Sequence, residues 1–181
     1  MVLILVIGPL LGSSQLYKAG TIDGLKRDNG FNRLVLGQEI EQISDNKLAY
    51  LEDFPRFDAD SCMFYEYHDE DVQLISKDLK IKFIAIRAYK FKIVNIYVLF
   101  DRSEGFKVLN NFLARYGQFT GRPNPYADVF EWDCSSVNLS LKYQLDVEFG
   151  IAVYTCKALD REIKERSKQQ LLQQKILANG N

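Results

Sequence analysis

The sequence predicts an α+β fold, in which antiparallel β-meanders pack on one helix and a second helix ends the chain. Apolar and polar residues alternate over 79–87, and residues 91–100 are almost continuously apolar, as in a strand that is covered on both sides. Residues 104–116 instead repeat their apolar side chains at helical spacing, and Gly117 follows as a typical helix terminator. The 12 phenylalanines and 10 tyrosines also favour strands.

Length and charge limit the possible functions. The chain has 181 residues, of which 47% are hydrophobic, so it is long enough to bury a core without disulfides or metals. Its 23 basic and 24 acidic residues are mixed along the sequence and give a formal net charge of −1. This balance lacks the basic surface that binding to nucleic acid or to an anionic membrane requires. We therefore expect a globular protein that needs no cofactor and whose partner is another protein or a small ligand.

The first fourteen residues have the features of a secretory signal peptide. Residues 2–11 are almost entirely apolar, and the small residues Gly12, Ser13 and Ser14 follow them, as at a cleavage site. The run is too short to span a bilayer as a helix, and no later segment is apolar enough to do so. This pattern predicts a periplasmic or secreted protein. No Lys or Arg precedes the run, so the alternative is a cytosolic protein in which residues 2–7 form a buried strand.

The rest of the sequence divides into a lead-in, one domain and a terminal helix. Residues 15–30 contain three glycines and few apolar residues, which predicts a flexible lead-in. The domain covers 31–157, and the highly charged residues 158–181 predict a solvated helix, with a short partner-binding or self-association segment at 171–177 as the alternative. Within the domain we expect a strand at 31–36, a helix-like piece after Gly37, a loop at 53–60, strands at 63–68, 72–76, 79–87 and 91–100, a helix at 104–116, and strands at 126–133, 137–143 and 148–156.

The two possible halves of the domain, 31–101 and 102–157, repeat a similar order of elements. A shift of sixty-five positions places Tyr65-Glu66-Tyr67-His68 over Phe130-Glu131-Trp132-Asp133 and brings the two expected helices into rough correspondence. This similarity predicts a duplicated unit of one helix and three strands. Few positions are identical, so chance similarity between strands of ordinary composition is the alternative.

These elements also resemble known proteins. The stretch from Phe31 to Gly37 with Ile40 and Ile43 behind it, the helix end from Leu109 to Gly117, and the strand with Phe130-Glu131-Trp132 resemble uncharacterised small exported bacterial proteins. The repeated helix-plus-meander unit is similar in outline to the β-lactamase inhibitor protein fold and to related outer-membrane assembly lipoproteins. This likeness covers element order over about 31–156 and includes no specific motif. The resemblance implies a partner-binding role and transfers no functional residue.

Glu66 and His68 are the first candidate binding residues. Strand alternation places both on one face, with Tyr65 and Tyr67 on the other. His68 is the only histidine, and Asp69-Glu70-Asp71 follows it directly. An imidazole with several carboxylates could bind a divalent cation, but the spacing matches no calcium loop. We therefore interpret 69–71 as a solvated acidic turn and assign no metal ligand.

Glu131 and Trp132 are the second pair of candidates. The internal similarity places Glu66 and Glu131 at equivalent positions, so an alternative function is a small cell-envelope hydrolase that uses this carboxylate pair. Ionic or hydrogen-bonding contacts across strands are the structural explanation for the same residues. Trp132 could offer a stacking platform for a sugar or a peptide, whereas most tryptophans on strands belong to the core.

The three cysteines are too few and too scattered for a zinc site. A hairpin that turns near 145–146 brings Cys134 and Cys156 close together, so these two are candidates for a disulfide in an oxidising compartment. The sequence contains no clear nucleophile–base pair, metal quartet or phosphate-binding loop, and we assign no catalytic residue. The most favoured function is a non-enzymatic, exported binding module that acts through a sheet face.

Overall fold

The computed structural model describes residues 20–52, 62–144 and 147–179. The signal peptide expected at 1–14, the alternative strand at 2–7, the first part of the lead-in and the loop expected at 53–60 lie outside these described residues.

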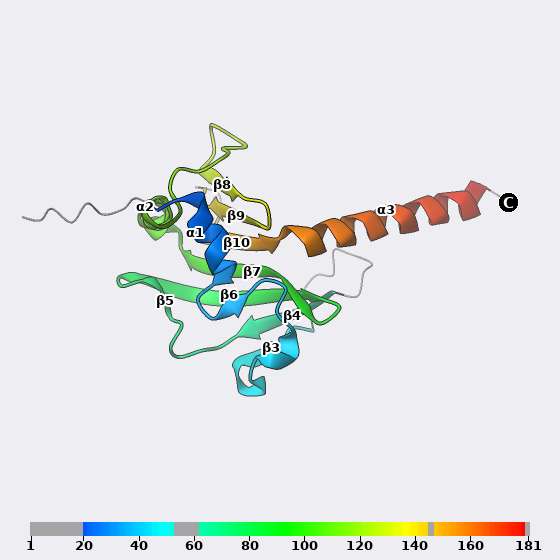
Figure 1. Ribbon diagram of the computed structural model, residues 1–181, viewed down its shortest axis with the longest axis horizontal. Coiled ribbons are helices and arrows are strands. Elements are labelled where there is room, and N and C mark those ends of the chain that lie inside the picture. Colours follow the sequence, from blue (N-terminus) through cyan, green and yellow to red (C-terminus); the bar gives the residue numbers. More distant parts are fainter. Residues whose placement is uncertain (1–19, 53–61, 145–146, 180–181) are drawn as a thin grey trace, which may run out of the picture.

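One large antiparallel sheet carries the fold, with the strand order β3–β4–β6–β7–β10–β9–β8 and with β5 paired to the beginning of β6 (Figure 1). Its long central strands are β6 and β7, which the alternating and continuous apolar patterns predict. The α+β prediction is therefore confirmed. The strands are β3 (Leu48–Tyr50), β4 (Cys62–Tyr67), β5 (Leu74–Ser76), β6 (Leu79–Tyr89), β7 (Lys92–Asp101), β8 (Val129–Asp133), β9 (Val137–Lys142) and β10 (Phe149–Cys156).

Two helices and a small hairpin cover one face of this sheet, which we call the covered face. The helices are α1 (Ile22–Asp28) and α2 (Gly105–Tyr116), the second preceded by the short 3₁₀ helix η3 (Arg102–Glu104); the hairpin is β1 (Gly30–Phe31) with β2 (Leu34–Val35). Phe112 of α2 meets the ring of Trp132 edge to face, with 5.8 Å between ring centroids. Leu109, Phe112 and Tyr116 are buried as their spacing predicts, together with Val108. Phe106, in contrast, is 66% exposed.

The segment expected as a flexible lead-in contains α1. Leu25 of this helix is fully buried, and the backbone N–H of Gly20 donates to the carbonyl of Ala114 in α2. A side chain at Gly20 would overlap the backbone of Arg115, and one at Gly24 would crowd it. These two glycines therefore allow close contact with α2, and the prediction of a flexible lead-in is wrong for residues 22–28.

The helix-like piece expected after Gly37 is also different. Ile40 and Ile43 are buried as predicted, but the segment forms two short 3₁₀ helices, η1 (Ile40–Gln42) and η2 (Asp45–Lys47), that lead into β3; Ile40 begins η1, and Ile43 lies between the two. The pairing of the two halves differs as well, because β4 pairs directly with β6 whereas β8 pairs with β9. The described structure thus does not repeat a helix-plus-three-strand unit, and the predicted duplication is wrong.

The C-terminal helix α3 (Lys157–Asn179) continues directly from β10, as the charge pattern predicts. Its first turns pack on the sheet face opposite the covered face, where Ile163 and Leu159 contact a small cluster of Cys62, Tyr89 and Val94. The rest of α3 projects beyond the sheet (Figure 1). None of the described helices is both long and apolar enough to cross a membrane.

Candidate functional site

The sheet face opposite α1 and α2, which we call the open face, holds two of the candidate residues from the sequence analysis, Glu66 and Glu131. Ile86, Ile96 and Tyr154 belong to the core on the covered face, so their strand neighbours point to the open face. The strand register arranges these neighbours in rows across the sheet. One row consists of Glu66, Ala85, Tyr97, Val153, Ser140 and Glu131, and the next consists of Phe83, Leu99, Ile151, Lys142 and Val129.

The middle of the open face is apolar and partly accessible. We call this patch the apolar centre; it consists of Phe83, Tyr97, Leu99, Ile151 and Val153. Each of these five side chains is partly exposed, and Phe149 at the end of β10 is 40% exposed. Charged residues border the patch, with Glu66 at one end of the Tyr97 row and Glu131 at the other. An apolar middle with a polar border is the usual anatomy of a protein interface.

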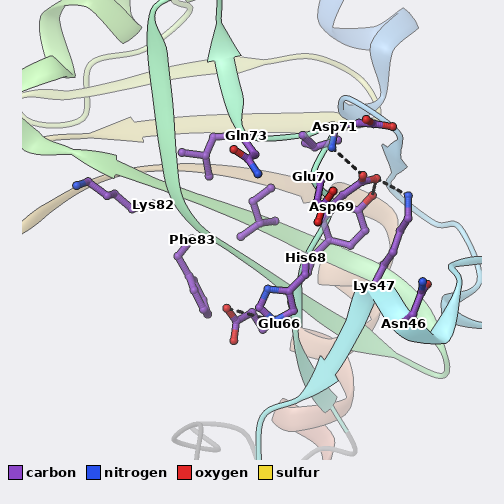
Figure 2. A pocket seen from close by; sticks show the side chains of 14 residues that line it. Asn46, Lys47, Glu66, His68, Asp69, Glu70, Asp71, Gln73, Lys82 and Phe83 are labelled. Atoms are coloured by element: carbon purple, nitrogen blue, oxygen red, sulfur yellow. Dashed lines mark hydrogen bonds and ion pairs between the residues drawn. The ribbon is translucent and has the colours of Figure 1, made fainter.

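A cavity of about 770 Å³ opens beside this patch, at the place where the first residues of β6 extend past the end of β4 (Figure 2). Strand β4 pairs with β6 as far as Ala85, and β5 resumes the pairing at Lys80. Residues 68–73 make a detour between these two points, and β6 lines the cavity with Lys82 and Phe83. Figure 2 shows Glu66 and His68 close together in this cavity; their Oε1 and Nε2 atoms are 3.4 Å apart. The predicted placement of Glu66 and His68 on one side of the strand thus agrees with this geometry.

The expected solvated acidic turn includes a buried carboxylate. The side chain of Asp69 is 3% exposed; it accepts hydrogen bonds from Lys47 Nζ at 2.7 Å and from the Tyr67 hydroxyl at 2.8 Å. The bond from Lys47 is the main cause that lowers the pKa of Asp69 to about 2. Burial and the bond to Asp69 raise the pKa of Tyr67 well above its usual range. The other two residues of the turn are solvated as expected: Glu70 is exposed, and the side chain of Asp71 is 69% exposed.

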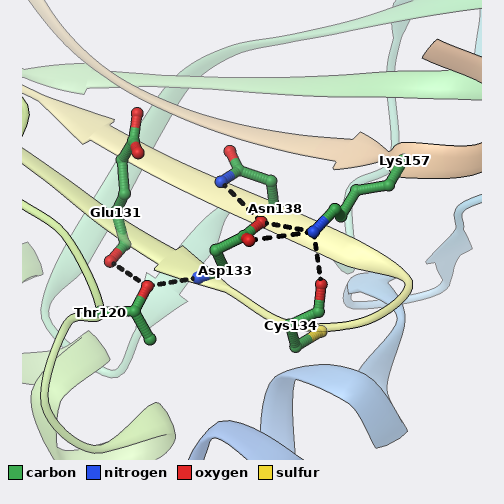
Figure 3. A network of polar contacts seen from close by, with 6 residues as sticks. All are labelled: Thr120, Glu131, Asp133, Cys134, Asn138 and Lys157. Carbon is green, nitrogen blue, oxygen red and sulfur yellow. Dashed lines mark hydrogen bonds and ion pairs between the residues drawn. The ribbon is translucent and has the colours of Figure 1, made fainter. Parts of the chain in front are cut away.

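A second polar network joins β8, β9 and the first residue of α3 (Figure 3). Lys157 Nζ donates to both carboxylate oxygens of Asp133 and to the carbonyl of Cys134, each at 2.9 Å. The ammonium of Lys157 lowers the pKa of Asp133. Figure 3 shows the Glu131 carboxylate pointing away from this pair, while its backbone carbonyl accepts a hydrogen bond from the Thr120 hydroxyl. This network fixes the start of α3 and leaves Glu131 facing outward.

Glu66 and Glu131 do not form a carboxylate pair. They lie at opposite ends of one row, and four strands separate β4 from β8. At about 4.8 Å between neighbouring strands, the two residues are about 24 Å apart along the sheet. Glycosidases hold their two carboxyl groups within about 10 Å of each other, so this pair cannot flank one bond. The hydrolase alternative based on Glu66 and Glu131 is therefore wrong.

Trp132 is a core residue rather than a binding platform. Its side chain is fully buried between α2 and the sheet, where Phe112 and Phe119 meet its ring edge to face. The indole Nε1–H donates to the carbonyl of Gly117 at 2.9 Å, which satisfies the polar end of the side chain. Because β8 alternates, burial of Trp132 is what turns its neighbour Glu131 to the open face.

The predicted disulfide is not formed. Cys134 and Cys156 are both free thiols. In the β9–β10 pair Cys156 lies opposite Val137, and the N–H of Cys134 donates to the carbonyl of the same Val137 from the preceding turn. Cys134 and Cys156 therefore lie on opposite sides of Val137 with β9 between them, and two strand spacings, about 10 Å, are too long for a disulfide. Among the described residues, no group of three or more His, Cys, Asp and Glu is placed to hold a metal ion.

Comparison with known proteins adds no family. No protein-family model, no curated protein and no solved structure matches this chain. The likeness to the β-lactamase inhibitor protein fold and to small exported bacterial proteins therefore stays a prediction from element order.

Proposed function

We propose that this protein is a non-enzymatic interaction module that binds a protein surface through the open face of its sheet. The observation that supports this proposal is the partly exposed apolar centre on strands β6, β7 and β10. Strand β7 is almost continuously apolar, a pattern typical of strands that are covered on both sides. Helices α1 and α2 lie on one side, and α3 packs on a corner of the other side around Tyr89 and Val94. A protein partner completes the missing layer.

The chemistry of the open face favours a protein over a small ligand. Its apolar side chains come from three neighbouring strands and form a broad patch instead of an enclosed hollow. Contiguous apolar patches with a polar border mark protein interaction sites. The cavity at the end of β4 adjoins this patch and shares Phe83 and Glu66 with the open face. A partner docked on the apolar centre can place one polar or basic side chain in that cavity.

A photo-crosslinking experiment tests this function. The photoreactive amino acid p-benzoylphenylalanine replaces Tyr97 in the apolar centre, and in a matched control it replaces Tyr126, which is 98% exposed and lies in the loop before β8. Both changes exchange one aromatic residue for another. After irradiation in the producing cell, we expect a discrete protein adduct at position 97 that is lost when Leu99→Arg is added. Equal labelling at both positions, or an adduct that Leu99→Arg leaves unchanged, contradicts the proposal.

The same proposal places the module in the periplasm or outside the cell, on the basis of the apolar run at residues 2–11 and the small residues that follow it. The intact mass of the protein recovered from a bacterial host tests this placement. Loss of about fourteen N-terminal residues supports export, and a chain that keeps them supports the cytosolic alternative.

A further inference from the structure

We infer that the open face of one chain is covered by the C-terminal part of α3 from a second copy, so that two chains form a reciprocal dimer. This inference rests on the proposed function and names its partner. The chain carries two unfinished surfaces: a sheet face without a complete helix layer, and a helix whose end projects beyond the sheet (Figure 1). Leu171 and Leu172 on that helix are 58% and 60% exposed. The projecting helix can supply the layer that the sheet face lacks, and the sheet face can bury the exposed leucines of the helix.

The helix presents apolar side chains on different sides in its two parts. Ile163 is 3% exposed and packs on a corner of the chain's own open face. An α-helix turns about 100° per residue, so Leu172 lies about 180° around the axis from Ile163. Because α3 is continuous from Lys157 to Asn179, Leu172 points away from the sheet on which Ile163 rests. It therefore faces a layer that the same chain does not supply.

A two-fold symmetric dimer covers the open face and buries the exposed part of α3 in both chains at once. The two α3 helices then lie side by side between two open faces, and each helix contacts its own sheet through Ile163 and the other sheet through Leu172. Such an interface is isologous, so it closes at two copies and does not propagate into a fibre. It also explains how the projecting end stays helical, since isolated helices of about 12 residues are only marginally stable in water.

Charge and area agree with this arrangement. Arg166 donates a hydrogen bond to the Tyr89 hydroxyl of its own sheet, and beyond it the sequence contains two cationic residues, Lys168 and Lys175, and no acidic one. Carboxylates flank the apolar centre at both ends of its Tyr97 row, at Glu66 and Glu131, while the next row contains one cation, Lys142. A 12-residue helix about 18 Å long and 10 Å wide buries about 350 Å² of its own surface and as much of the sheet. Two such contacts bury about 1,400 Å², which is the size of a stable protein interface.

The oligomeric state of the full chain is the first test. Sedimentation equilibrium between 1 and 100 µM should give twice the mass of one chain as purified, which is 20.9 kDa for the whole sequence. Leu172→Asp on the exposed helix should raise the dimer dissociation constant at least tenfold, and so should Leu99→Arg in the apolar centre. Phe106→Asp is the matched control, because Phe106 is equally exposed but lies on α2. A monomer at 100 µM overturns the inference, as does a dimer that Leu172→Asp leaves unchanged.

Crosslinking then locates the contact. Chains with p-benzoylphenylalanine at position 172 are mixed with ¹⁵N-labelled chains and irradiated, and mass spectrometry identifies the labelled peptides. We expect adducts with β7 or β10 of the other chain. Adducts with α3 of the other chain alone overturn the inference, because they indicate a helix–helix dimer. If the chain is monomeric while position 97 crosslinks a different protein, this inference fails and the proposed function stands; if position 97 crosslinks no protein, both fail.

Discussion

The buried carboxylate of Asp69 provides a sharp test of the structure. Asp69→Asn keeps the size of the side chain but removes the charge that holds Lys47 and accepts the Tyr67 hydroxyl. Lowering the pKa of this carboxyl from 3.8 to about 2 corresponds to at most about 2.5 kcal/mol, at 1.36 kcal/mol per pKa unit. Allowing for the partly exposed Lys47, we expect the substitution to reduce the free energy of unfolding by about 1 to 2 kcal/mol at pH 7.

The pH dependence follows from the direction of the pKa change. The carboxyl of Asp69 has a lower pKa in the folded protein than in the unfolded chain, so the stability it contributes is fully present above about pH 5. That stability is lost as the pH falls through 3.8 towards about 2. The difference in unfolding free energy between the native protein and Asp69→Asn should therefore shrink over this interval.

Urea unfolding at pH 7, 5, 4 and 3 measures this difference. The fluorescence of Trp132 reports unfolding, since this residue is the only tryptophan and is fully buried. Asp71→Asn is the control, because the Asp71 side chain is 69% exposed and pairs with the exposed Arg33; it should cost less than about 0.5 kcal/mol. A constant difference between pH 7 and pH 3, or a cost equal to that of Asp71→Asn, refutes the reasoning.

Two further substitutions test the packing of β10 and the network at the start of α3. In Gly150→Ala the new methyl group overlaps the buried ring of Phe100, so we expect a loss of about 2 kcal/mol in urea unfolding, whereas Gly121→Ala has room and should stay within about 0.5 kcal/mol. Lys157→Met removes the ammonium beside Asp133, so the pKa of that carboxyl should rise in an NMR titration; an unchanged pKa contradicts the contact.

The long strands could be predicted from the sequence because their patterns are strong and local. The alternation over 79–87 lies within β6, the apolar run over 91–100 covers all of β7 except its last residue, and the helical spacing of Leu109, Phe112 and Tyr116 identifies α2. Where the local pattern is weaker, it is compatible with more than one kind of local structure. The three-residue spacing of Ile40 and Ile43 suits an α-helix, but in the structure this segment forms two 3₁₀ helices that are followed by a short strand. The glycines before α1 suggest flexibility, whereas Gly20 and Gly24 allow contact with α2.

The candidate site could be predicted only where it is local. Glu66 in β4 and His68 directly after it are two residues apart in the sequence, and the structure brings their side chains together. Lys82 and Phe83 line the cavity because the beginning of β6 extends past the end of β4. This offset depends on how segments distant in the sequence pair, so no local pattern predicts it. The register between β6 and β7 also shifts between Ile81 and Phe83. Simple alternation assigns these two residues to the same face, but the bulge leaves Ile81 on the covered face and Phe83 on the open face. Nor does any local signal show that the acidic turn buries Asp69.

Glu66 and Glu131, which the sequence similarity places at equivalent positions, lie at the two ends of one row of the sheet. Strands β7 and β10 pair at the middle of the sheet, with Tyr97 opposite Val153 and Leu99 opposite Ile151. The first half of the domain supplies one end of each row, and the second half supplies the other. The apolar centre therefore exists only where the two halves meet, and neither half contains it alone. Because that pairing also buries the core on the covered face, the interface and the fold depend on the same contact between distant segments. Substitutions that test the interface must therefore change only side chains on the open face, as Leu99→Arg does.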